Sequence, residues 1–159
     1  MARVMERHAL VDPREVEVAT PPPLVAMGVT PTAVQPNTDY DGYRVKSDDR
    51  PEIYLVMFGY RRWIPNPATY NNLFRDWNGI LRFPNRDALD NAIPEGAGIW
   101  DGAVLARGAT LSPVYLITDN VRMWVTAPAV MDKYYFAWNK VVVVPNAIIQ
   151  SIYNGASLS

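Results

Sequence analysis

The chain has 159 residues, with 15 basic and 16 acidic side chains, one histidine and no cysteine. This balance excludes the basic excess that nucleic-acid and anionic-membrane binders usually carry. The lack of cysteine excludes disulfides, thiolate metal sites and thiol nucleophiles, and His8 has no second imidazole with which to hold a metal. We therefore expect no metal, no cofactor and no nucleic-acid partner.

Neither end of the sequence has the pattern of a membrane or export segment. Residues 1–17 carry charge throughout, without an apolar run of signal-peptide length, so no secretory signal is predicted. The uncharged stretch 141–159 contains Pro145 and Asn146 and has a polar end, so we expect no membrane insertion. The location is left open between the cytoplasm and export by a non-standard route.

The first part of the chain differs in composition from the rest. Residues 1–39 contain six prolines, including Pro21–Pro23, whereas all 18 aromatic residues lie from Tyr40 onward. A segment without aromatic residues has little to bury, so residues 1–40 are predicted to form an extended, proline-rich arm. This arm is either a linker or a segment that docks on a neighbouring subunit or a protein partner.

An internal repeat organises the remainder of the chain. When the sequence is shifted by 61 residues, Ile53–Asn85 aligns with Val114–Asn146 without a gap, and ten of the 33 aligned pairs are identical. The Asp-Gly pairs at 41 and 101 extend the match upstream. These matches predict two units, residues 41–100 and residues 101–159.

Each unit begins with the same predicted local structures. The Asp-Gly pairs are typical of tight turns, and in the second unit Gly98–Trp100 and Ala103–Ala106 are predicted to form a strand pair around one of them. Phe58-Gly59 and Asp119-Asn120 then predict hairpins with two-residue turns. This register places Tyr54 opposite Trp63 and Tyr115 opposite Trp124, with Val56 opposite Arg61 and Ile117 opposite Arg122.

A short helix is expected after each hairpin. Asn66 followed by Pro67 is typical of a helix start, and apolar residues then recur at helical spacing up to Trp77, as they do up to Trp138 in the second unit. The two tryptophans are therefore predicted to be core, and Asn78 and Asn139 to end the helices in left-handed geometry. Short buried strands (80–83 and 141–144) and a second helical turn (after Asn85 and Asn146) complete each unit.

The predicted fold class is α+β. Two tandem hairpin-plus-short-helix repeats of about 60 residues are expected to share one core, because a unit of this size is marginally stable alone. The edges of such small sheets are available for pairing, so self-association into a homo-oligomer is plausible.

Parts of both units resemble a known kind of repeat. The strings Val114–Ile117 and Arg61–Tyr70, together with Trp77, are similar to short tandem repeats common in bacterial, especially actinobacterial, proteins, where they are often appended to extracellular or cell-wall proteins. The second unit departs from this pattern at Met123 and at Thr126-Ala127. The resemblance implies an accessory binding or structural module and carries over no catalytic residue.

The strongest candidate site is the face of each hairpin that carries a tyrosine, an arginine and a tryptophan: Tyr54, Arg61, Trp63, Tyr115, Arg122 and Trp124. Aromatic rings stack on sugar rings, and an arginine beside them binds hydroxyl, carboxylate or phosphate groups. This interpretation requires Trp63 and Trp124 to be exposed. In the alternative, the aromatic residues pack in the core and the arginines cap helix carbonyls or pair with Asp.

Catalytic chemistry has weaker support. A serine or threonine nucleophile lacks a base, since His8 lies in the arm. Paired carboxylates for glycoside hydrolysis could come from Asp76, Asp87, Asp90 and Glu95, but positions 76 and 87 correspond to Ala137 and Ile148 in the second unit. No phosphate-binding glycine loop is present, and the Asp-Gly pairs are interpreted as turns rather than calcium ligands.

Two functions are retained from these observations. The first is a non-catalytic, lectin-like module that binds a glycan or cell-surface polymer through the repeated Tyr/Arg/Trp face. The second is a structural or assembly protein that oligomerises or docks through its N-terminal arm. A carboxylate-based hydrolase is the least favoured possibility.

Overall fold

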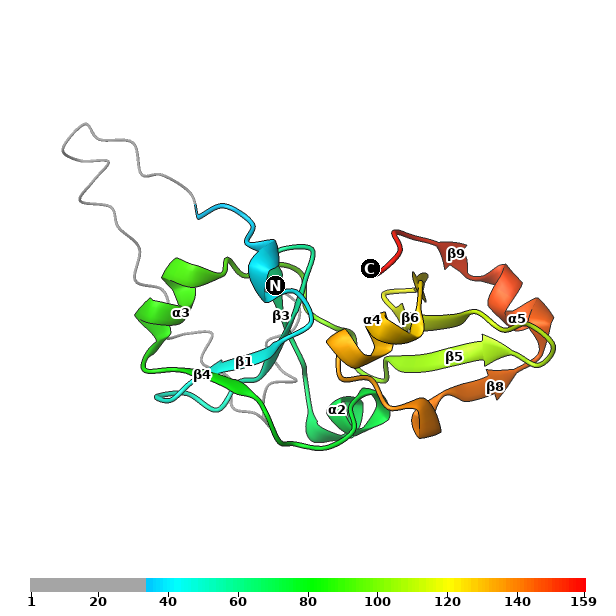
Figure 1. The fold of residues 1–159 in the computed structure, drawn as a ribbon, viewed down its shortest axis with the longest axis horizontal. Coiled ribbons are helices and arrows are strands. Elements are labelled where there is room, and N and C mark those ends of the chain that lie inside the picture. Colours follow the sequence, from blue (N-terminus) through cyan, green and yellow to red (C-terminus); the bar gives the residue numbers. More distant parts are fainter. Residues whose placement is uncertain (1–33) are drawn as a thin grey trace.

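The computed structural model describes residues 34–159 and contains two mixed β-sheets with short helices (Figure 1). The expectation of an α+β fold is confirmed. Most of the predicted arm, residues 1–33, lies outside the described residues.

The first sheet has four strands in the order β3-β2-β1-β4. β1 pairs antiparallel with β2 and parallel with β4, and β2 forms a hairpin with β3. The elements of this half are η3 (Thr38–Tyr40), β1 (Arg44–Ser47), β2 (Tyr54–Met57), β3 (Tyr60–Trp63), α2 (Pro67–Leu73), β4 (Leu81–Phe83) and α3 (Arg86–Ala92).

The second sheet has five strands in the order β8-β5-β6-β7-β9. β5 pairs antiparallel with β6 and parallel with β8, and β6 forms a hairpin with β7, so these four strands are connected as in the first sheet. The elements of this half are β5 (Val104–Gly108), β6 (Val114–Thr118), β7 (Val121–Val125), α4 (Pro128–Lys133), η4 (Trp138–Lys140), β8 (Val142–Val144), α5 (Asn146–Ser151) and β9 (Tyr153–Asn154).

Both predicted hairpins form with two-residue turns. Phe58 and Gly59 have φ values of 56° and 82°, and Asp119 and Asn120 both have 56°. Positive φ at both central residues is the type I′ geometry that suits the twist of paired strands. The predicted register is confirmed in both hairpins, with each tyrosine opposite its tryptophan and each arginine opposite its Val or Ile.

The helix starts follow the predicted capping chemistry in the first half. The Asn66 side chain accepts a hydrogen bond of 2.8 Å from the Thr69 amide, and Pro67 occupies the first turn of α2. The Asn85 side chain accepts a bond of 2.8 Å from the Ala88 amide at the start of α3. These bonds satisfy amide groups that a helix leaves unpaired at its N-terminus.

The helices are shorter than the apolar spacing predicted. α2 ends at Leu73 and α4 at Lys133, so Trp77 and Trp138 lie beyond them, and their side chains are 42% and 51% exposed. The prediction that these tryptophans are core is therefore wrong. α2 ends where Phe74 pairs with Phe136 in an isolated antiparallel bridge. α4 ends before Tyr135, which has a φ of 59°, and the Phe136 amide donates back to the Met131 carbonyl at 2.9 Å.

Three smaller expectations are also wrong. Positive φ occurs at Gly79 and Tyr135 rather than at Asn78 and Asn139. Residues 98–100 form no strand, because the Ile99 amide donates to the Trp63 carbonyl at 2.9 Å instead of pairing with β5. The strands predicted to be buried are not: β4 has an exposed central residue between two half-buried ones and β8 is largely exposed, and each lies at the edge of its sheet.

One buried cluster draws side chains from both halves. Leu55, Tyr70 and Phe74 belong to the same core as Leu105, Leu116, Tyr134 and Phe136. Helix α2 lies between the two sheets (Figure 1). The rings of Phe74 and Phe136 are 5.7 Å apart, and the Ala137 amide donates to the Leu73 carbonyl at 2.9 Å. Each half therefore completes the core of the other.

Removing the ring at this junction should destabilise the whole chain. We expect Phe136→Ala to lower the free energy of unfolding by about 3–5 kcal/mol, because it leaves a cavity in a shared core. Urea unfolding followed by circular dichroism measures this. Tyr153→Ala, at an exposed position, is the control and should change stability by less than about 0.5 kcal/mol. Equal losses in the two variants would contradict the shared core.

Candidate functional site

The Tyr/Arg/Trp face of the first hairpin lies inside the protein. Trp63 is 1% exposed, and Tyr54 and Arg61 are also buried. The aromatic side chains form a cluster with Leu89 of α3 and with Ile93, which caps that helix. The exposure of Trp63 that a binding role requires is therefore absent, because α3 covers this face. Burial raises the pKa of the Tyr54 phenol.

Arg61 in this cluster has a structural role. Its Nη1 donates to the Ile93 carbonyl at the end of α3 (2.5 Å), and its Nη2 lies 2.6 Å from Asp90 Oδ1. Its guanidinium carbon is 5.0 Å from the centre of the Tyr54 ring. This agrees with the interpretation in which the arginine caps helix carbonyls and pairs with Asp.

Arg122 repeats this arrangement in the second hairpin. Its Nε donates to the Ile152 carbonyl at the end of α5 (3.0 Å), and its guanidinium carbon is 5.0 Å from the centre of the Tyr115 ring. Its Nη1 donates to the Tyr115 hydroxyl at 3.0 Å. With the residues that the structure describes, Arg122 forms no ion pair, and its Nη2 makes no hydrogen bond. The Arg122 guanidinium therefore has no carboxylate partner among the described residues, whereas that of Arg61 has Asp90.

The second hairpin differs from the first in exposure. Trp124 is 42% exposed, and Tyr115 and Arg122 are half-buried. The same surface that α3 closes in the first half is therefore open in the second.

Two substitutions between the halves account for this difference. In the first half, Arg86 Nη2 lies 3.2 Å from both Glu52 Oε1 and the Tyr54 hydroxyl, and this buried pair packs beside the aromatic face. The 61-residue shift places Pro113 at the position of Glu52 and Ala147 at that of Arg86. These shorter, uncharged side chains cannot form the pair, so the edge of the face beside Tyr115 and Trp124 lacks that cover.

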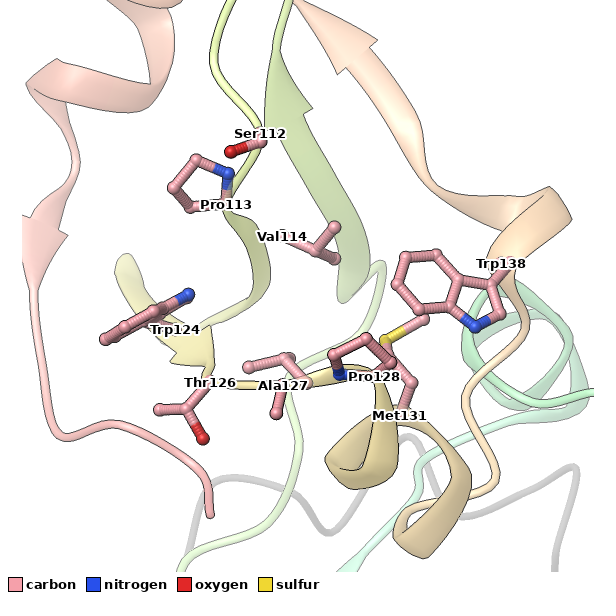
Figure 2. Close-up of a pocket in the computed structure, with 10 residues that line it drawn as sticks. Ser112, Pro113, Val114, Trp124, Thr126, Ala127, Pro128, Met131 and Trp138 are labelled. Carbon is pink, nitrogen blue, oxygen red and sulfur yellow. The ribbon is translucent and has the colours of Figure 1, made fainter.

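A pocket lies at the open end of the second hairpin. Its volume is about 270 Å³, and Figure 2 shows Trp124 and Trp138 on opposite sides of it, with Pro113, Val114 and Pro128 between them. The start of β6, the end of β7 and the first turn of α4 supply its walls. The pocket adjoins the candidate face through Trp124.

Sequence reasoning missed Trp138 and the pocket. Helical spacing predicts that Trp138 is core, but α4 ends at Lys133, five residues before it. The aligned units do contain a sign that the two faces differ, because Pro113 and Ala147 replace the charged Glu52 and Arg86.

The candidate carboxylates are engaged in structural contacts. Asp90 and Glu95 both face Arg61, at 2.6 and 3.8 Å. Asp76 accepts a hydrogen bond of 2.7 Å from the Tyr135 hydroxyl, and this bond holds the pKa of that carboxyl below its ordinary value. Asp87 lies in the first turn of α3, where its negative charge interacts favourably with the helix dipole. Within residues 34–159, no three His, Asp or Glu side chains are grouped so as to hold a metal ion.

Comparisons with protein-family models, with curated proteins and with solved structures gave no match. In the part of the chain that the structure describes, no helix has the length and apolar character needed to cross a bilayer.

The two arginines should differ in their contribution to stability. Arg61→Ala leaves Asp90 and the Ile93 carbonyl without their buried partner, so the free energy of unfolding should fall by about 2–4 kcal/mol. Arg122→Ala removes hydrogen bonds at a half-buried site and should cost about 1 kcal/mol. Urea denaturation of the two variants measures both values. A loss for Arg122→Ala as large as that for Arg61→Ala would contradict the different roles assigned to them.

Proposed function

We propose that residues 41–100 and 101–159 are two copies of one unit with a shared core, and that the protein is a non-catalytic binding module. The aligned sequences, the matching strand connections of the two sheets and the mixed membership of the main core support this proposal. In this account the first copy stabilises the fold, and the second carries the binding surface.

The observation that carries the proposal is the opening of the second aromatic face. Trp124 offers a half-exposed ring for stacking on the apolar face of a sugar, as aromatic side chains do with flat apolar surfaces. Arg122 lies on the same face, with Nη2 available to a hydroxyl or carboxylate of the ligand. The ligand class that this chemistry favours is a glycan or a cell-surface polymer, bound through Tyr115, Arg122 and Trp124.

The resemblance to bacterial tandem repeats supports the same class of function. That resemblance implies an accessory binding or structural module and no catalytic residue. Because the first face is closed, the proposal contains one binding face per chain in place of the two that the repeat suggested.

Binding should depend on Trp124 and not on a tryptophan of equal exposure elsewhere. The full chain is titrated with soluble oligosaccharides of neutral sugars, amino sugars and uronic acids, and the indole N–H signals are followed by NMR. We expect the Trp124 signal to shift with at least one sugar class and the response to be lost in Trp124→Ala and weakened in Arg122→Ala.

Trp77→Ala is the matched control, because Trp77 and Trp124 are both 42% exposed. This variant should bind as the unchanged chain does. No shift with any sugar class, or equal binding by Trp124→Ala, would overturn the proposed function.

A further inference from the structure

The pocket between Trp124 and Trp138 has the character of a peptide groove. Every side chain that lines it is uncharged, and most are apolar; the set is Ser112, Pro113, Val114, Trp124, Val125, Thr126, Ala127, Pro128, Met131 and Trp138. Trp138 also borders a second hollow of about 360 Å³, to which Arg107, Val141 and Val143 contribute. The hollow surface thus continues past Trp138, where Arg107 adds the charged side chain that the first pocket lacks.

The two tryptophans have unused hydrogen-bond donors. Neither indole N–H donates to any group among the described residues, whereas the Trp77 indole donates to Asn71 Oδ1 at 2.9 Å. Grooves that recognise polyproline II segments are lined by aromatic rings. Here two half-exposed indole rings with available N–H groups flank an apolar surface. The rings pack against proline side chains, and the N–H groups bond to carbonyls that this helix leaves without internal partners.

The chain itself contains a segment of that chemistry. Residues 18–38 carry no charged side chain and include Pro21, Pro22 and Pro23, followed by Leu24. An uncharged, proline-rich segment matches an uncharged groove, because neither side loses the solvation of a charge on contact. We propose that Pro21–Leu24 of the chain's own N-terminal arm dock in the groove between Trp124 and Trp138.

The place where the described chain begins allows this contact. The Asn37 amide donates to the Gly59 carbonyl at 2.9 Å, which fixes the start of the described residues at the β2–β3 turn. Phe58 of that turn lines a hollow together with Asp119 and Met123, so the β2–β3 turn lies beside the β6–β7 turn. The groove lies at the other end of the β6–β7 hairpin.

The arm is long enough to cover this distance. Strand β7 has five residues and spans about 16 Å. The ten residues 24–33 span about 30 Å in the polyproline II conformation, so the segment reaches from Val34 past the length of the hairpin. A tethered segment has an effective concentration in the millimolar range, so the chain's own arm competes favourably with the arm of another copy.

The contact can be tested in the full chain because the sequence contains no cysteine. Ala26→Cys then gives one site for a nitroxide label close to the prolines. Paramagnetic broadening of the indole N–H signals reports which tryptophans lie near the label. Trp77 and Trp100 serve as controls within the same sample, since they are 42% and 49% exposed.

We expect several-fold stronger broadening at Trp124 and Trp138 than at the two control tryptophans, independent of protein concentration. The variant P21G/P22S/P23G in the labelled chain should remove this difference. Equal broadening at all four tryptophans, or a difference that persists in the glycine and serine variant, would overturn the proposal.

A mixed sample identifies whose arm is bound. Isotope-labelled chain without nitroxide is combined with nitroxide-labelled chain without isotope. Selective broadening at Trp124 and Trp138 in this mixture would overturn docking of the chain's own arm and assign the contact to a second copy. The docked arm covers the Trp124 ring that the proposed sugar site uses, so the arm and a sugar compete for it. The sugar titration is therefore also run on P21G/P22S/P23G, in which the ring is open, so that failure of one proposal is distinguishable from failure of the other.

Discussion

The fold depends on the contact between Phe74 and Phe136. Their segments run antiparallel, with the Ala137 amide bonded to the Leu73 carbonyl and the Arg75 amide to the Tyr135 carbonyl. This exchange ends α2 and places the apolar side chains of α2 and α4 in one core. Arg44 of β1 strengthens the junction, because its buried guanidinium donates to the Tyr70 hydroxyl at 2.6 Å and lies 4.1 Å from the Tyr135 ring centre.

Because the core is built jointly at the junction, the outer faces of the two sheets are free to differ. The first outer face is closed by α3 and by the buried pair of Glu52 and Arg86. The second has Pro113 and Ala147 at those positions and leaves Trp124 half-exposed. The equivalent arginine caps α3 in the first half and α5 in the second, so the shared pattern is explained by folding. Function is therefore assigned to what differs between the halves.

Much of the local structure follows from the sequence. Hairpin turns and their register come from short-range chemistry at Gly59 and Asn120, and the α2 start comes from Asn66 and Pro67. The ends of the helices do not follow from the apolar spacing. α2 ends because Phe74 pairs with Phe136, which is far away in the chain, and α4 ends at a left-handed Tyr135, a residue type that does not signal this geometry. For the same reason the exposure of Trp77 and Trp138 was predicted wrongly. The six candidate site residues look equivalent between the two units, and it is packing by α3 together with the buried Glu52–Arg86 pair that separates Trp63 from Trp124.

The central claim is that one aromatic face is closed and its counterpart is open. Hydrogen exchange of the tryptophan indole N–H groups, followed by NMR in the P21G/P22S/P23G chain, whose arm leaves the second face open, tests it directly, because exchange requires access of water to each indole. We expect the Trp63 signal to persist long after those of Trp77 and Trp100 have exchanged, and Trp124 to exchange much faster than Trp63. Equal exchange at Trp63 and Trp124, whether slow or fast, would contradict it.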